Sequence, residues 1–223
     1  MSKKSSNVFF LGIFLCLVCA IAAGVMGSAA AVTRKPIELA KIKKVAEGLR
    51  KVLPDFDNDP MKTAVKFDGV LFYTAKKGGK TVGYAAETSV GSGYGGRIDA
   101  LVSFQPDGTI RSFMVTNHSE TPGLGSNAAD RVRKKTLAGL IKGVPAESGL
   151  PPNRILDQYA GHSAAKTDSW KQPWKLKKDG GQAEYITGAT ISSRAVNELA
   201  WKAASVFEAH RQELAAGPKG VKK

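Results

Sequence analysis

The stretch on which the fold depends is Glu184–Val196, which reads Glu-Tyr-Ile-Thr-Gly-Ala-Thr-Ile-Ser-Ser-Arg-Ala-Val. Tyr185 and Ile186 favour the end of a strand, and Gly188 suits a tight turn because it has no Cβ atom. Apolar residues then recur at helical spacing. They are Val196, Leu199, Ala200, Ala203, Ala204 and Phe207. The stretch therefore predicts a strand end, a turn and the start of a helix.

Four hydroxyl side chains stand at this turn, and each is a candidate N-cap of the predicted helix. They are Thr187, Thr190, Ser192 and Ser193. We expect Thr190 to present its hydroxyl close to the free N–H groups and partial positive charge of the helix N-terminus, which favour a phosphate. The residues alone leave two interpretations open: an anion site that contains a hydroxyl, or a Ser/Thr-rich cap before an amphipathic helix.

The motif Thr187–Thr190, followed by Ser193 and Val196, resembles the flavinylation motif of the FMN-binding G subunit of Rnf-type electron-transport complexes. The C subunit of the sodium-pumping NADH:quinone reductase has a similar motif. In that family a flavin transferase moves FMN from FAD to the last Thr or Ser of the motif, which then holds FMN through a phosphodiester. The resemblance implies covalent FMN on Thr190. The other cofactor-binding residues that it implies here are Thr187, Gly188 and Ala189.

One position departs from the family pattern. The family usually has Asp six residues before the acceptor, and this chain has Glu184. The charge is kept, and the side chain is longer by one methylene. The substitution of Glu184 for the usual Asp would affect how the flavin transferase recognises the motif.

Two further segments resemble parts of these FMN domains. Glu120–Gly125, Glu-Thr-Pro-Gly-Leu-Gly, is similar to the signature beside the isoalloxazine ring, and Gly93–Gly96, Gly-Tyr-Gly-Gly, is similar to the glycine segment on the flavin side. The implied cofactor-binding residues are Glu120, Thr121, Leu124, Tyr94 and Gly95. Lys177 or Lys178 would steady the negative charge of reduced flavin, or would only be solvated.

The glycines at Gly91–Gly96 also match the dinucleotide pattern G-x-G-x-x-G. That fingerprint requires a helix after the glycines, whereas Ile98–Phe104 is typical of a strand. We therefore predict a bulge or a close backbone approach at this loop.

Composition limits the function classes. The 223 residues carry 33 basic and 19 acidic side chains, a formal net charge of +14. A basic balance suggests nucleic acid, an anionic membrane surface or an acidic partner, but no nucleic-acid motif accompanies it, so nucleic acid is not predicted. Cys16 and Cys19 both lie in the apolar N-terminal run and the histidines are scattered, so no metal site or iron–sulfur cluster is predicted. No catalytic constellation is found.

The N-terminal run Val8–Val32 carries no charge, and its apolar part is close to the ~20 residues that a membrane-spanning helix needs. A cleaved signal peptide is the alternative, although its apolar region usually has roughly 7–15 residues. We predict an uncleaved anchor. Basic residues flank the run on both sides, but long domains translocate largely regardless of charge. The resemblance implies a single-pass protein of the bacterial inner membrane, with the FMN domain on the periplasmic, extracytoplasmic side.

The rest of the chain predicts a mixed domain. Pro36–Leu53 has an apolar stripe and a basic face that either rests on anionic lipid headgroups or is solvated. Four strands joined by short turns predict antiparallel hairpins. They are Val70–Ala75, Thr81–Glu87, Ile98–Phe104 and Ile110–Thr116. Ala128–Lys142 is predicted to be a helix and Lys142–Gln172 a loop.

The predicted class is therefore α+β, an antiparallel sheet flanked by helices on one N-terminal transmembrane helix. The predicted segments are an anchor (1–32), an amphipathic helix and linker (33–60), an FMN-binding domain (61–212) and a basic tail (213–223). The resemblance implies an electron-carrying subunit of an ion-translocating membrane oxidoreductase, with other subunits and a flavin transferase as partners. The alternatives are a basic membrane-tethered binding module without a redox role, a flavin-dependent reductase acting alone, and the C subunit of a sodium-pumping NADH:quinone reductase.

Overall fold

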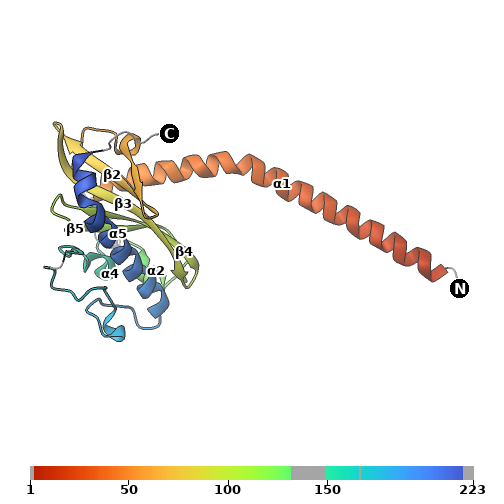
Figure 1. The fold of residues 1–223 in the computed structure, drawn as a ribbon. Helices are drawn as coiled ribbons and strands as arrows, with labels where there is room; N and C mark the ends of the chain where they lie inside the picture. The colour runs from red at the N-terminus through yellow and green to blue at the C-terminus, as the bar shows by residue number, and fades with distance from the viewer. Residues whose placement is uncertain (1–2, 132–148, 166, 218–223) are drawn as a thin grey trace, which may run out of the picture. The chain divides into compact units, whose positions relative to one another are not determined.

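The computed structural model of the chain describes residues 3–131, 149–165 and 167–217 (Figure 1). The chain divides into two compact units, Met1–Lys44 and Val45–Lys223, which are described separately. The first unit holds most of helix α1. The second holds a five-stranded sheet, the end of α1 and the remaining helices.

Helix α1 spans Lys3–Val52 with Pro36 inside it. The segment Pro36–Leu53, which the sequence predicted as a separate amphipathic helix after the anchor, is therefore the continuation of α1. The Thr33 hydroxyl donates to the carbonyl oxygen of Ala29, 2.8 Å away, as it does within a helix. Proline removes one backbone donor and crowds the preceding turn. The sequence before Pro36 is rich in alanine, the residue with the highest helix propensity, and α1 continues through Pro36.

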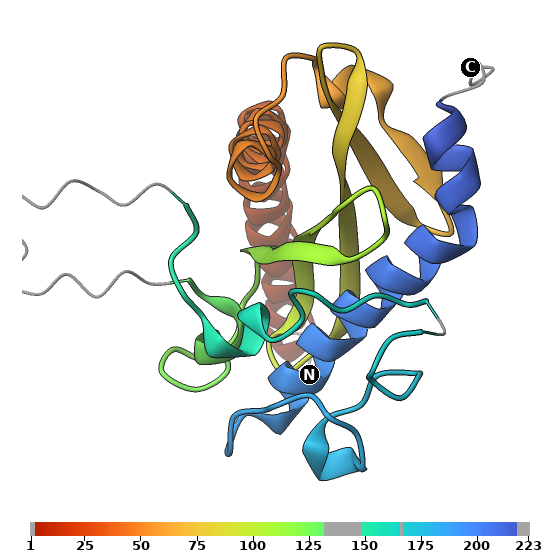
Figure 2. The same ribbon diagram turned by 90° about the vertical axis from the view of Figure 1, so that its left-hand side faces the viewer.

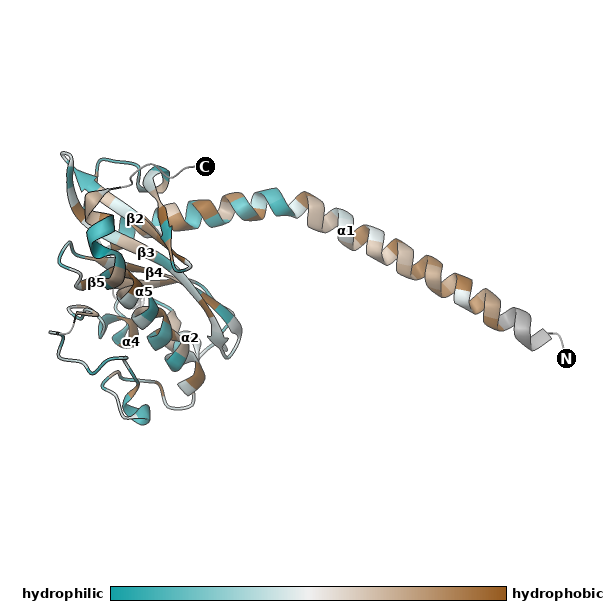
Figure 3. Cartoon of the chain, viewed as in Figure 1, coloured by the Kyte–Doolittle hydropathy of each residue, from teal (hydrophilic) through white to brown (hydrophobic). Residues whose placement is uncertain are grey.

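The N-terminal part of α1 is long and apolar enough to cross a membrane. Figure 3 shows its apolar colour along this part and more polar residues after it. Its side chains from Val8 onward are exposed, Cys16 and Cys19 among them. Length and composition fit the predicted anchor and a signal sequence alike, so the absence of cleavage stays a prediction.

The sheet has five antiparallel strands in the order β1-β2-β3-β4-β5. Their bounds are β1 Val65–Phe67, β2 Val70–Lys77, β3 Lys80–Gly93, β4 Gly96–Phe104 and β5 Ile110–Asn117. The four predicted strands are confirmed. Strand β1 was not predicted, because its three residues are too few to form a run of branched and aromatic side chains. It joins β2 through Asp68 and Gly69, both at positive φ, as in an Asp-Gly hairpin turn.

Strand β3 is longer than predicted, and this matters for the site. It continues beyond Glu87 to Gly93, and Val90 pairs with Ile98 of β4. Gly93 then pairs with Gly96, so Tyr94 and Gly95 form the tip of a long hairpin. The prediction that this glycine segment leads into a strand is confirmed.

Each face of the sheet is covered by a helix (Figure 2). Helix α5, Thr190–Ala216, covers one face, and its Phe207 ring stacks on Phe104 with centroids 4.6 Å apart. On the other face Leu49 and Val52, from the end of α1, are buried with Tyr73 and Leu101. An antiparallel sheet with a helix on each face is the α+β arrangement that the sequence predicted.

Between β5 and α5 the described residues contain only short helices. They are α2 Ser126–Ala129, α4 Arg154–Asp157 and η2 Lys177–Asp179, and one more short helix, η1 Pro60–Thr63, precedes β1. The predicted helix Ala128–Lys142 is wrong at Asp130, which is extended, and residues 132–142 lie outside the described residues. The predicted loop Lys142–Gln172 contains α4, because the Asn153 side chain accepts from the backbone N–H groups of Ile155 and Leu156.

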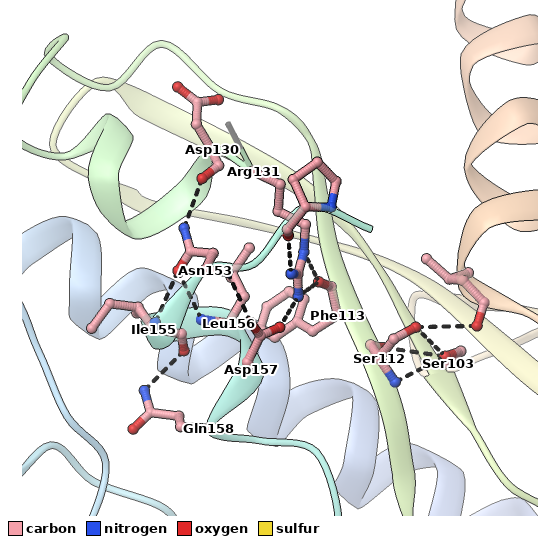
Figure 4. A network of polar contacts seen from close by, with 12 residues as sticks. Ser103, Ser112, Phe113, Asp130, Arg131, Asn153, Ile155, Leu156, Asp157 and Gln158 are labelled. Carbon is pink, nitrogen blue, oxygen red and sulfur yellow. Dashed lines mark hydrogen bonds and ion pairs between the residues drawn. The ribbon is translucent and has the colours of Figure 1, made fainter. Parts of the chain in front are cut away.

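Arg131 attaches this segment to the sheet (Figure 4). Its guanidinium donates to the carbonyl oxygen of Phe113 on β5, to that of Pro151, and to the Asp157 carboxylate at 2.6 Å. Asn153 donates to the carbonyl oxygen of Asp130 at 2.7 Å. These bonds hold α4 and the end of α2 close to β5, and so place the turn between β5 and α2.

Candidate functional site

Helix α5 begins at Thr190 without a side-chain cap. Its N-cap is Ala189, so the prediction that a Ser or Thr side chain caps the helix is wrong. The Ser193 hydroxyl instead accepts from the backbone N–H of Ile186 and donates to the carbonyl oxygen of Ala189. The first N–H groups of a helix have no partner within the helix. Within the described residues the Thr190 hydroxyl also has no hydrogen-bond partner, so donors and a free hydroxyl lie side by side.

The segment before α5 is a turn and not the end of a strand. Tyr185 and Ile186 are half-buried against the core but pair with no strand among the described residues. The local pairing is a single parallel bridge between Leu176 and Ala183. Strand propensity largely reflects how well a side chain fits a half-buried surface. Tyr185 and Ile186 occupy such a surface against the core without forming the hydrogen bonds of a strand within the described residues. Gly188 has φ +86°, as the predicted turn requires.

A cavity of about 480 Å³ lies at the N-terminus of α5. That volume is typical of small-molecule sites. Its walls come from the hairpin tip of β3 and β4, the β5–α2 turn, η2 and the first turn of α5. The lining residues are Tyr94, Thr121, Leu124, Gly125, Lys178, Gly188, Ala189, Thr190, Ile191 and Ser192.

The structure brings most of the predicted site residues together at this cavity. Thr190, Gly188, Ala189, Thr121, Leu124 and Tyr94 line it. Glu120, Gly95 and Thr187 do not line it. Glu120 and Gly95 lie behind the wall, hydrogen-bonded to each other, and Thr187 is exposed in the turn before Gly188. Ile191, Ser192 and Gly125 line the cavity and were not among the predicted site residues, whereas Lys178, which also lines it, was one of two lysines considered for the flavin.

Exposed apolar side chains gather at the same cavity. Outside α1, the exposed large apolar residues of the described chain are Tyr94 (70% exposed), Leu124 (48%) and Ile191 (47%), and all three line it. Apolar surface gathered around a hollow is expected where a ligand covers it. In the sequence, Ile191 directly follows the proposed acceptor Thr190, and this large apolar side chain in the first helical turn was the feature that could have indicated its place in the site.

Among the basic groups near the cavity, Lys178 differs from its neighbours in its ion pairing. Lys177 pairs with Glu184, and this ammonium holds the pKa of the Glu184 carboxyl below its usual value. Arg194 donates to both oxygens of Asp179 and lowers the pKa of that carboxyl. Lys178 has no salt bridge among the described residues and lines the cavity. Of the two lysines considered from the sequence, Lys178 is the one at the site.

The fold and the cavity define a small α+β domain with a ligand site at a helix N-terminus. The family model of the FMN-binding domain matches residues 93–205, about half of the chain and all the residues that line the cavity. The chain belongs to this FMN-binding domain family.

Its relatives carry a more particular name. The chain is 32% identical over 218 residues to the G subunit of the ion-translocating oxidoreductase complex of Cereibacter sphaeroides, covering 95% of this chain and 89% of that protein. The G subunit of Haemophilus influenzae is 32% identical over 87% of this chain and 86% of its own length. That of Vibrio cholerae is 28% identical over 91% of both.

The lining residues fit FMN. The phosphate end would meet the Thr190 hydroxyl and the first N–H groups of α5, whose dipole favours an anion. The isoalloxazine ring is flat and mostly apolar, and Tyr94, Leu124 and Ile191 provide apolar surface for it. Lys178 provides one positive charge. These donor, apolar and charged groups correspond to the parts of one FMN molecule.

Proposed function

We propose that this chain is the electron-carrying G subunit of an ion-translocating oxidoreductase complex in the bacterial inner membrane, with FMN joined covalently to Thr190. The observation that carries the proposal is the position of Thr190. It is the first residue of α5, it lines the cavity, and its hydroxyl has no partner within the described residues. The FMN-binding family and the relatives named as G subunits support the same function.

The proposed attachment uses the Thr190 oxygen. Thr190 Oγ1 gains a bond to the phosphorus of FMN as the pyrophosphate bond of FAD breaks, AMP leaves, and the hydroxyl proton is released. A flavin transferase would catalyse this step. The phosphodiester keeps one negative charge, which a helix N-terminus stabilises by roughly 0.3–1 kcal/mol where it is exposed. Thr190 thus fixes one end of the cofactor while the ring stays in the cavity.

The remaining residues would bind the ring and control its surroundings. When bound, FMN supplies reversible uptake of one or two electrons. Tyr94, Leu124 and Ile191 would cover its faces and exclude water, and Lys178 would favour the added negative charge. The sequence contains no recognisable set of residues for substrate chemistry. The chain would therefore pass electrons between other subunits of the complex, and the complex would couple this electron transfer to ion translocation.

The membrane part of the proposal rests on α1. An uncleaved α1 would anchor the subunit, with the FMN domain on the extracytoplasmic side. A mature protein that begins near Val32 by N-terminal sequencing would contradict the anchor. A domain resistant to added protease in intact spheroplasts would contradict the orientation.

Intact-mass measurement of protein co-expressed with the flavin transferase tests the attachment. The native chain is expected to gain one FMN minus water, and Thr190→Ala to lose that mass and the yellow colour that survives denaturation. Thr190→Ser should keep both. Thr121→Ala removes another hydroxyl from the same cavity and should stay loaded. Full loading of Thr190→Ala would refute the assignment.

A further inference from the structure

Glu120 is a buried carboxylate that touches two walls of the cavity from behind. The residue is 5% exposed. Its Oε1 accepts from the backbone N–H of Gly95 at 3.1 Å, and its Oε2 accepts from the hydroxyl of Ser192. Gly95 follows Tyr94 at the hairpin tip, and Ser192 lies in the same helical turn as Thr190. One side chain therefore links the segment of Tyr94 to the segment of Thr190.

The space around this carboxylate is filled. A Cβ atom at Gly93 would lie 2.5 Å from Oε1, and one at Gly125 would lie 2.5 Å from both Oε2 and the Ser192 Oγ. A Cβ atom at Gly95 would lie 2.0 Å from the carbonyl oxygen of Ser119. Glycine at these positions lets three backbone segments close around Glu120. The carboxylate is thus enclosed by these segments and does not line the cavity.

The backbone of Glu120 is held as well. Its N–H donates to His118 Nδ1 at 3.1 Å. Because Nδ1 accepts this bond, the ring proton lies on Nε2, which is 2.9 Å from the Asp130 carboxylate. Through His118, the turn that carries Glu120 is therefore attached to Asp130 at the end of α2, in addition to the two bonds of the Glu120 carboxylate.

We propose that Glu120 is a positioning residue of the FMN site, which sets the separation between Tyr94 and Thr190 without touching the flavin. The inference rests on the proposed function, since the cavity is taken as the FMN site. It differs from the expectation that Glu120 itself contacts the cofactor. The two bonds run to different chain segments, so loss of either frees one wall relative to the other. The cofactor is attached at one wall and covered by the other, and it responds to that movement.

The test uses full-length protein co-expressed with the flavin transferase. The variants are Glu120→Ala, Glu120→Gln and Ser192→Ala. Two controls remove buried polar groups elsewhere. Asp168→Asn alters a carboxylate that is 6% exposed and accepts from the N–H groups of Ser163 and Trp170. Ser103→Ala removes a buried hydroxyl bonded to Ser112. Each protein is measured for FMN mass, visible circular dichroism of the flavin, reduction potential and thermal midpoint.

Glu120→Ala is expected to lower the flavin dichroism by about twofold or more and to shift the potential, because sites tolerate only about 0.5 Å of displacement. Ser192→Ala should give a smaller change in the same direction. Glu120→Gln should lie between native and Ala, since its amide can still accept from Gly95 and donate to Ser192. The controls should lower the thermal midpoint but keep the native dichroism and potential. Loss of FMN from Glu120→Ala with full loading of Asp168→Asn also supports the proposal, because Thr190 is then no longer presented correctly.

Two results would overturn the inference. One is native dichroism and potential in fully loaded Glu120→Ala and Ser192→Ala. The other is an equal change in the controls, which would reduce Glu120 to a general stabilising residue. If Glu120→Ala does not fold, Glu120→Gln and Ser192→Ala still decide between these outcomes. A native chain without FMN mass would instead contradict the proposed function, so the two failures are distinguishable.

Discussion

The first turn of helix α5 and the stretch from Ala195 to Phe207 belong to one element, yet their side chains meet different surroundings. In the first turn Thr190 and Ile191 line the cavity, and Ile191 is exposed. In the later stretch Val196, Leu199 and Phe207 are buried against the sheet. The same helix therefore supplies a binding surface at one end and core packing along its body. We expect changes at the two regions to affect different measured properties.

The largest expected effect is on stability, at Phe207. Its ring contacts Phe72, Tyr84 and Phe104 at centroid distances of 4.6 to 6.1 Å. Phe207→Ala should lower the free energy of unfolding by about 3–5 kcal/mol, because it removes buried area and leaves a cavity. Urea denaturation of unloaded protein measures this. Thr190→Ala, the matched change at the other end, should stay within about 0.5 kcal/mol. A large loss there, or a changed flavin potential in folded Phe207→Ala, would remove the distinction.

A second effect is expected at Leu124, which lines the same cavity as the first turn of α5. Leu124→Ala should keep the covalent FMN mass, while the flavin absorption and reduction potential move because an apolar surface beside the ring is lost. Leu39→Ala, at an exposed leucine of α1, is the control and should leave both unchanged. A fully loaded Leu124→Ala protein with native spectrum and potential would show that the β5–α2 turn is only structural.

Lys178 is expected to have a smaller effect on the same potential. Its positive charge should stabilise reduced flavin, so Lys178→Gln should make reduction harder, by on the order of 1 kcal/mol for a charge near solvent. Lys175→Gln, an exposed lysine that does not line the cavity, is the control. Redox titration at low and high salt measures the difference, which should shrink as salt rises. Equal potentials for the two variants would place Lys178 among merely solvated lysines.

The smallest expected effect is a pH dependence at the other end of α5. His210 bonds to Glu213 at 3.0 Å and to Asp68 at 3.1 Å, and these carboxylates raise its pKa above 6.5. A raised pKa means that the folded state holds the proton more tightly. Its contribution is therefore complete below about pH 6.5 and is lost as pH rises through the higher folded value. His210→Gln should abolish this part of the stability difference between pH 6 and pH 8, measured by urea denaturation. An unchanged pH profile in that variant would exclude the His210 pairs as its source.

Local patterns in the sequence were sufficient for much of this protein. Runs rich in branched and aromatic residues, separated by turn signals, predicted β2 to β5, because such side chains fit the surface of a packed sheet. The motif around Thr190 predicted a hydroxyl at a helix start, because the turn at Gly188 and the apolar spacing after it are local features. The motifs Glu120–Gly125 and Gly93–Gly96 indicated the other two walls of the cavity through family resemblance.

Only the tertiary structure decided which of these residues line the cavity and which support it. Glu120 and Leu124 belong to one motif, yet Leu124 lines the cavity and Glu120 lies buried behind it. Lys177 and Lys178 are neighbours, yet Glu184 neutralises the first and the second faces the cavity. The helix that continues through Pro36 and the uncapped start of α5 also departed from local preference. Burial, ion pairing and packing depend on segments far apart in the chain, and no local pattern specifies where those segments meet.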